Sequence, residues 1–232
     1  MKIYIDRQKL NARAQAAHIA SIGGMVLLLI SVAIAMFLPK WGNFTSILMV
    51  IGAAGAMVGI YLANRWVRRP RPEESLDKAL KGFDDNYRIF HYPSSLPCEH
   101  VLLTPSGMLA LEVVNLNGYF SYRNGKWKEA MTMGRALRYL VEERVSNPVV
   151  LAPALVKDLH DRLDRELGDG TGVPIKALTV FTHPVVELEV EGGPIPAVKV
   201  DKLRKQIAMP GSRLTPEAYD KLCSYLEKLT VS

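Results

Sequence analysis

The pattern of hydrophobic and polar positions divides the chain into an apolar N-terminal part and a mixed remainder. Charged residues are absent from 19 to 64, with the single exception of Lys40. Each of the two apolar runs has about 20 residues, enough for a helix to cross roughly 30 Å of hydrocarbon. The pattern predicts a transmembrane helical hairpin at 19–64, with helices at about 19–38 and 44–64.

Two other interpretations fit part of this pattern. A signal peptide also begins with basic residues and an apolar stretch, but the first run is long and a second follows at once. A hairpin buried in a soluble core would rarely lack charge on all faces over this length. The membrane hairpin is therefore the interpretation we follow.

Basic residues flank the open side of the hairpin, whereas its tip carries only Lys40. The flanking residues are Lys2, Arg7, Lys9 and Arg13 before the hairpin and Arg65, Arg68, Arg69 and Arg71 after it. Because cytoplasmic flanks are enriched in Lys and Arg, both termini and the soluble domain are expected in the cytoplasm. The predicted location is the cell (inner) membrane, with a multi-pass chain whose basic flanks meet the lipid bilayer.

The chain thus divides into four segments. Residues 1–18 are predicted to form a basic cytoplasmic segment that lies along the membrane surface. The two transmembrane helices occupy 19–64. Residues 65–72 form a basic, proline-rich linker, in which proline ends the helix. Residues 73–232 form the soluble α/β domain.

Glycines recur in the second apolar run, at Gly52, Gly55 and Gly59. Gly55 and Gly59 form a small-xxx-small pattern, which allows two helices to approach closely. One interpretation is that these glycines pack against the first helix of the same hairpin. The other is a homodimer contact through the Gly55 and Gly59 face, or a contact with another membrane protein.

The periodicity after residue 72 predicts a mixed α/β fold with a small, partly antiparallel central sheet. Turn signals, caps and apolar runs predict helices at 73–82, near 130–145, from Asn147-Pro148 to about Leu167, after Asp201 and from Thr215-Pro216 to about Leu229. They predict strands at 87–92, 101–104, 108–114, 119–123, 177–182 and 185–190, and residues 198–200 lead into the helix after Asp201.

Charge and cysteine content narrow the function classes. Residues 1–71 hold nine Lys or Arg and one acidic residue, a net charge of +8, so the remaining 20 Lys or Arg and 22 acidic residues give the soluble domain −2. Such a domain is not expected to bind nucleic acid avidly. Cys98 and Cys223 have no partner at metal-ligand spacing, and both are expected to be free thiols in a reducing cytoplasm.

A run of short motifs at 98–127 resembles the nuclease-related domain (NERD), a branch of the PD-(D/E)XK nuclease-like fold. The motifs are Glu99-His100, Pro105-Ser106-Gly107, Glu112-Val113-Val114-Asn115, Gly118 and Gly125-Lys126-Trp127. The helix start at Glu73-Glu74, the Asn147-Pro148 helix, residues 180–184 and the C-terminal helix also fall where that family would have them. The resemblance covers about 73–230 and implies a PD-(D/E)XK-like domain behind the hairpin.

The resemblance implies a site in which two carboxylates at adjacent strand ends hold Mg²⁺ and a lysine stands two residues after the second carboxylate. This chain departs from that pattern, since Glu99 replaces the family aspartate and Val114 replaces the family lysine. Leu151 stands where a glutamine is often found. Only Glu112 matches outright, so the site is read as vestigial.

The leading interpretation is a noncatalytic scaffold or interaction subunit at the cytoplasmic membrane face, without a cofactor. The alternative is a Mg²⁺-dependent nuclease that uses Glu99 and Glu112 as metal ligands with a displaced lysine, Lys126 or Lys128. A third class, a nucleic-acid-binding module, would need a basic groove. Glu112 can also be a polar group bonded to the backbone, and His100 and His183 are interpreted as structural.

Overall fold

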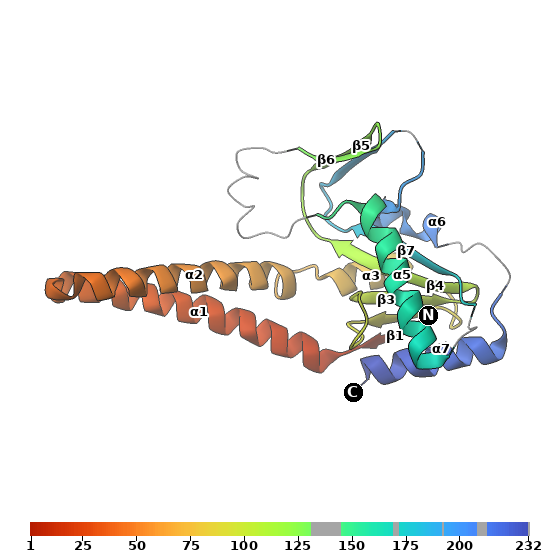
Figure 1. Ribbon diagram of the computed structural model, residues 1–232, viewed down its shortest axis with the longest axis horizontal. Coiled ribbons are helices and arrows are strands. Elements are labelled where there is room, and N and C mark those ends of the chain that lie inside the picture. The colour runs from red at the N-terminus through yellow and green to blue at the C-terminus, as the bar shows by residue number, and fades with distance from the viewer. Residues whose placement is uncertain (131–144, 169–171, 192, 208–212, 232) are drawn as a thin grey trace. The chain divides into compact units, whose positions relative to one another are not determined.

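The computed structural model describes two units (Figure 1). The described residues are 1–130, 145–168, 172–191, 193–207 and 213–231. The α/β unit comprises Met1–Asp6, Pro72–Ala130 and Val145–Ser232, and the hairpin unit comprises Arg7–Arg71. The helix predicted near 130–145 lies outside the described residues.

The hairpin unit is a pair of long helices. Helix α1 runs from Arg7–Phe37 and helix α2 from Gly42–Trp66, with a 3₁₀ turn at Pro39–Trp41 between them. The two-helix hairpin is confirmed, and both helices are long and apolar enough, by length and composition, to cross a membrane. Helix α1 begins well before residue 19, because the alanines, arginines and glutamines of 7–18 are good helix formers.

The contact between α1 and α2 repeats every seven residues. The buried positions are Leu10, Ala17, Gly24 and Ser31 on α1 and Thr45, Gly52, Gly59 and Trp66 on α2. Seven-residue spacing keeps one seam of a helix turned to its partner. Because the helices are antiparallel, the two series meet in reverse order, with the largest side chains at the open end and hydroxyls at the tip.

The close approach of the two helices requires glycine at the contact. A Cβ on Gly59 would lie 2.3 Å from the backbone nitrogen of Ser21, and one on Gly24 would lie 2.3 Å from that of Ala56. A Cβ on Gly52 would meet the backbone nitrogen of Leu28 at 3.0 Å. These glycines therefore pack inside the hairpin, the first of the two interpretations. A homodimer contact through Gly55 and Gly59 remains a prediction, and it would have to share a helix face with α1.

The α/β unit contains two sheets. Its elements are β1 (Lys2–Ile5), α3 (Pro72–Leu80), β2 (Arg88–His91), β3 (His100–Thr104), β4 (Gly107–Val114), β5 (Tyr119–Arg123), β6 (Lys126–Glu129), α5 (Pro148–Leu167), β7 (Ile175–Phe181), β8 (Glu187–Val190), β9 (Ala197–Lys199), the 3₁₀ turn Val200–Lys202, α6 (Leu203–Gln206) and α7 (Pro216–Thr230). The main sheet has the order β1-β2-β3-β4-β7-β9, and a second sheet has the order β6-β5-β8.

Strand β1 corrects the prediction for the N-terminal segment. Lys2–Ile5 is the edge strand of the main sheet and runs parallel to Arg88–His91. These residues therefore belong to the α/β unit and not to a helix-like segment on the membrane surface. The alternation of Ile3 and Ile5 with polar residues suits a strand as well as an amphipathic turn. With β1 and β9 at its edges, the main sheet has six strands and is larger than predicted.

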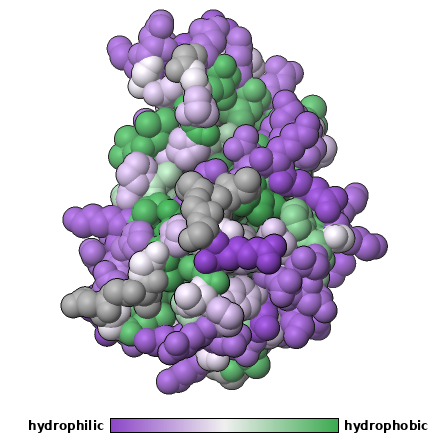
Figure 2. All heavy atoms as spheres, turned by 90° about the vertical axis from the view of Figure 1, so that its right-hand side faces the viewer, coloured by the Kyte–Doolittle hydropathy of each residue, from purple (hydrophilic) through white to green (hydrophobic). Residues whose placement is uncertain are grey.

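Each face of the main sheet has its own apolar core. On one face, α5 and α7 pack over strand residues such as Phe90, Val101 and Ala110. On the other face, α3 and α6 pack over residues such as Ile89 and Leu109. Figure 1 shows α5 lying across the sheet. On the face drawn in Figure 2, hydrophilic side chains surround and separate the hydrophobic ones, whereas the hairpin exposes large apolar side chains along both helices.

Candidate functional site

The register of the main sheet brings the two predicted carboxylates together. Strands β3 and β4 are antiparallel, and His100 pairs with Leu111. One step further along the same register, Glu99 lies opposite Glu112. Strand β7 continues the row, because Glu112 pairs with Thr179 across the parallel β4–β7 contact. Paired residues share one face of a sheet, so Glu99, Glu112 and Thr179 form a polar row on the face that α5 covers.

The thiol of Cys98 lies within the electrostatic reach of both carboxylates. Cys98 is 4% exposed, and Glu99 and Glu112 are each half-buried. Burial, the largest cause, and the negative charges of Glu112 and Glu99 together raise the pKa of the Cys98 thiol to about 12. Cys98 is therefore a protonated, inert thiol at neutral pH.

The row offers two carboxylates as possible metal ligands. Mg²⁺ takes six oxygen ligands, often one or two carboxylates with water completing the shell. In the part of the chain that the structure describes, no group of three or more His, Cys, Asp and Glu side chains is placed to hold a metal ion. Glu99 and Glu112 would supply two carboxylate ligands, without a third acidic or histidine ligand from the described residues.

Val114 occupies the lysine position of the family pattern, on the same strand face as Glu112. It is 9% exposed and belongs to an apolar cluster with Leu116, Phe120, Phe181 and Val186. Trp127 packs against this cluster, and its ring lies 5.9 Å from that of Phe120. We refer to these six residues as the Val114 cluster. It fills the space beside Glu112 with hydrocarbon.

The two candidate replacement lysines lie on β6, on either side of Trp127. Strand β6 pairs with β5 in the second sheet, and both Lys126 and Lys128 are exposed. Successive side chains of a strand point to opposite faces. Since Trp127 packs into the Val114 cluster, Lys126 and Lys128 point to the other face of β6.

His100 is turned to the opposite face of the main sheet from Glu99. It is 1% exposed, and its Nδ1 lies 2.8 Å from Nδ1 of the equally buried His91. The Nε2 of His91 lies 3.0 Å from an oxygen of Asp77 on α3. This polar group ties α3 to β2 and β3, which is a structural role.

The other two positions singled out by the family pattern lie outside this row. The ring of His183 accepts a hydrogen bond from the backbone N–H of Val185 at 3.3 Å, within the turn that follows β7. Leu151 is half-buried in the first turns of α5. The Leu151 side chain has no group with acid–base chemistry, and the bond from Val185 to His183 stays within that turn.

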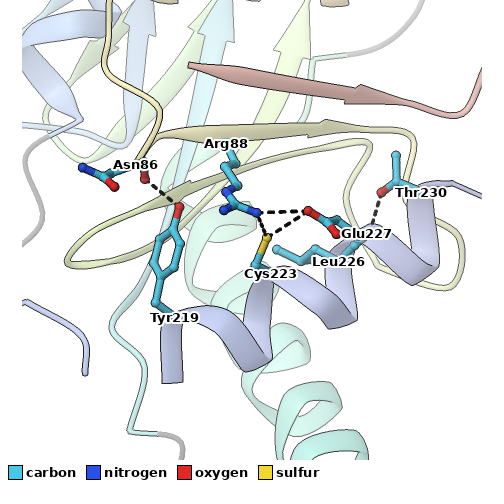
Figure 3. Close-up of polar contacts among 7 residues, drawn as sticks. All are labelled: Asn86, Arg88, Tyr219, Cys223, Leu226, Glu227 and Thr230. Carbon is cyan, nitrogen blue, oxygen red and sulfur yellow. Dashed lines mark hydrogen bonds and ion pairs between the residues drawn. The ribbon is translucent and has the colours of Figure 1, made fainter. Parts of the chain in front are cut away.

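A second polar cluster, which the sequence motifs did not indicate, joins β2 to α7 (Figure 3). The guanidinium of Arg88 donates to the Sγ of Cys223 and, at 3.0 Å, to the carboxylate of Glu227. The thiol of Cys223 also donates to Glu227, at 3.2 Å. Cys223 and Glu227 are four residues apart on one helix face, which the sequence could have indicated. Arg88 comes from a distant strand and could not have been assigned.

The raised pKa of the Cys223 thiol indicates that the Arg88–Cys223–Glu227 cluster has a structural role. Burial and the bond to Glu227 raise the pKa of the Cys223 thiol to about 11, although Arg88 acts in the opposite sense. The thiol is therefore protonated at neutral pH and is a poor nucleophile. Hydrogen bonding to Glu227 raises the pKa of Tyr4 to about 12, which connects β1 to the same cluster.

The comparisons with known proteins assign no family. No protein family model, no curated protein and no solved structure matches the chain. The likeness to the nuclease-related domain therefore remains an expectation from the sequence motifs.

Proposed function

We propose that this protein is a membrane-anchored, NERD-like interaction module whose nuclease-type site has lost its activity. In this proposal the α/β unit is a noncatalytic scaffold that holds a partner at the cytoplasmic face of the cell membrane. The hairpin supplies the anchor, and the PD-(D/E)XK-like sheet supplies the binding platform. The partner is expected to be a membrane protein or a protein close to the membrane.

The environment of Val114 is the observation that carries the proposal. A nuclease of this type needs a positive charge beside its carboxylates to stabilise the charge that develops during phosphoryl transfer. Val114 has no charge, and the Val114 cluster surrounds it with apolar groups. A lysine from β6 would have to reach across from the other face of that strand.

The membrane placement is supported by the exposed surface of the hairpin. Large apolar side chains are exposed along both helices, and they include Leu29, Phe37 and Val50. In water, an apolar surface of this extent would associate nonspecifically, whereas in a bilayer it faces lipid. The basic residues at the open end favour the cytoplasmic orientation.

The alternative is a Mg²⁺-dependent nuclease. It is favoured by one specific observation, the register that sets Glu99 opposite Glu112 at adjacent strand ends. If Mg²⁺ binds there, the two carboxylates would be its protein ligands and the ion would polarise a phosphate. The missing lysine makes this the second candidate.

A cleavage assay separates the two candidates. The full chain should be used, because β1 precedes the hairpin and a domain that begins at residue 73 would lack an edge strand. Purified in mild detergent, it should cleave neither DNA nor RNA with Mg²⁺ or Mn²⁺ above the level of its Glu112→Gln variant. Metal-dependent cleavage that disappears in both Glu112→Gln and Glu99→Gln would overturn the proposal and establish the nuclease.

The scaffold role needs its own measurement. Chemical crosslinking in native membranes, followed by mass spectrometry, should recover a recurrent partner crosslinked to lysines of the α/β unit. A chain with residues 7–71 replaced by an unrelated membrane hairpin is the matched control for contacts made by the hairpin alone. If the α/β unit of the native protein is crosslinked to no partner, that result would contradict the scaffold role.

A further inference from the structure

The membrane hairpin begins directly at the end of a sheet strand. Strand β1 ends at Ile5 and helix α1 begins at Arg7, so only Asp6 separates them. One residue spans at most about 3.8 Å between Cα atoms, so this connection can absorb little movement. At the other end of the hairpin, residues 67–71 give α2 a longer connection to α3.

The bonding of β1 to the sheet continues up to that connection. All four residues of β1 pair with β2, from Lys2 with Arg88 to Ile5 with His91. The backbone N–H of Asp6 also donates to the carbonyl of His91, at 3.3 Å. The covalent path from α1 to the β1–β2 ladder therefore runs through Asp6 alone.

Tyr4 carries the connection from β1 to the C-terminal helix. Its ring stacks on Phe90, with centroids 4.8 Å apart and planes 11° apart. The side chain packs against a core cluster that includes Leu222 and Leu226 of α7. The Glu227 carboxylate, which also holds Arg88 at 3.0 Å, is a hydrogen-bond partner of the Tyr4 hydroxyl.

Strand β1 is also one of the two edge strands of the main sheet, so it is well placed to shift. It lies at the edge, has four residues and is exposed at Lys2 and Ile3. Elements with few buried contacts open at lower free energy than core strands. A shift of β1 would move the Tyr4 hydroxyl away from Glu227 while Arg88 and Cys223 keep their bonds to that carboxylate.

We propose that β1 is a coupling strand, which transmits displacements of α1 in the bilayer through Tyr4 to the last turns of α7. The proposal names a conformational device and rests on the membrane placement proposed above. Its output is the local stability of Glu227–Thr230, where the Thr230 hydroxyl donates to the carbonyl of Leu226 at 2.8 Å (Figure 3).

The test uses bilayer thickness as the input and hydrogen exchange of α7 as the output. The full chain is reconstituted in nanodiscs of short-, medium- and long-chain phosphatidylcholine, which tilt or shift a hairpin of fixed length. In the wild type, amide exchange at the C-terminal turns of α7 should change by about two- to fivefold across the series, as expected for a small change in local opening.

Two variants interrupt the path, and each has a matched control. A flexible Gly-Ser insertion between Asp6 and Arg7 should abolish the response, whereas the same insertion between Arg68 and Arg69 should preserve it. Tyr4→Phe keeps the stacked ring and removes the hydroxyl, so it should weaken the response. Tyr219→Phe removes a hydroxyl bond from α7 to the carbonyl of Asn86, at 2.7 Å, and should leave the response intact.

The outcomes that overturn the coupling differ from those that overturn the membrane placement. If the hairpin is protected from protease in nanodiscs but amide exchange of α7 does not change with bilayer thickness, the coupling alone is refuted. A response that survives the insertion after Asp6, in a protein whose cysteines remain protected from thiol reagents, would also refute it. Failure of the hairpin to enter the bilayer would refute the membrane placement, and the coupling with it.

Discussion

Replacing Val114 by lysine tests whether the nuclease-type site is vestigial, because it restores the family residue at its own position. Val114 is 9% exposed and is packed within the Val114 cluster. The substitution puts an ammonium group among apolar side chains, where burial disfavours its charge. Glu112 lies on the same strand face, two residues away, and pairing with it offsets part of that penalty.

The expected loss follows from these opposing terms. Full burial of a valine contributes about 1.5–3 kcal/mol, and the lysine stem keeps part of that contact. Desolvation of the amine adds to the loss, so we expect a net destabilisation of about 1–3 kcal/mol. For a protein of this size, each kcal/mol lowers the midpoint of thermal unfolding by about 2–4 °C. Because burial lowers the pKa of an amine, the loss should shrink in alkaline buffer.

A thiol-reactive fluorescent dye measures this loss in the full-length protein. The chain has two cysteines, and both are buried in the α/β unit. The dye therefore reports the unfolding of that unit and is blind to the hairpin. Val185→Lys is the matched control, since Val185 is 70% exposed and an exposed substitution should change stability by less than about 0.5 kcal/mol.

The result that would refute the reasoning is specific. A Val114→Lys protein with an unchanged unfolding midpoint and new Mg²⁺-dependent cleavage would mean that the metal site is intact and lacked only its lysine. Cleavage by Val114→Lys that is lost again on adding Glu112→Gln would assign that activity to the site. The protein would then be a nuclease inactivated by one substitution.

Three further predictions follow from the structure. Gly59→Ala should destabilise the hairpin, because the new Cβ would lie 2.3 Å from the Ser21 nitrogen, whereas Gly23→Ala faces open space and should have little effect. Disulfide trapping between α1 and α2 measures the effect of both substitutions, and equal trapping in the two variants would count against the contact. Since the folded state raises the pKa of Tyr4 from 10.0 to about 12, its stabilising contribution is complete below about pH 10 and is lost as the pH rises towards 12; Tyr4→Phe should remove that part of the alkaline sensitivity, and an unchanged profile would contradict it. A cysteine replacing Gly42, where a Cβ meets nothing within 4 Å, should react with an impermeant reagent outside intact cells, and one replacing the exposed Lys128 should not; the reverse pattern would invert the topology.

Local signals in the sequence predicted most elements of the α/β unit. The side chain of Asn147 caps α5 by accepting from the N–H of Val149 at 3.1 Å, and Thr215 caps α7 by accepting from the N–H of Ala218 at 3.2 Å. Such caps depend on residues close in sequence, so they can be identified without tertiary information. The Asn124-Gly125 turn likewise has positive φ at both residues, which is the geometry that joins β5 to β6.

The parts that were missed depend on contacts between distant segments. Strand β1 pairs with residues more than 80 positions away, and no local pattern announces that partner. The seven-residue series on α1 and α2 was present in the sequence. It is hard to recognise in apolar helices, because the residues at the helix contact are no more apolar than those on the other faces. The Arg88–Cys223–Glu227 cluster depends on how α7 lies against β2, which is a property of tertiary packing.

The candidate site was predictable only where it depends on residues close in sequence. The order of motifs put Glu99 before one strand and Glu112 in the next, and hairpin geometry then sets them opposite each other. The sequence alone did not identify the neighbours of Val114. The partners Phe120 and Phe181 come from β5 and β7, and their convergence on Val114 requires the two sheets to be placed together.

The position of β1 also sets an order of events during synthesis. The strand precedes residues 88–91 in the chain, so it has no partner in β2 until those residues have been translated. Closing a chain loop of that length carries an entropic penalty, which falls when the ends of the loop are already close. A hairpin that has entered the bilayer returns the chain to the side from which it departed. Membrane insertion would thus prepare the completion of the main sheet, and a chain whose hairpin fails to insert would emerge with the edge of β2 unpaired and prone to aggregate.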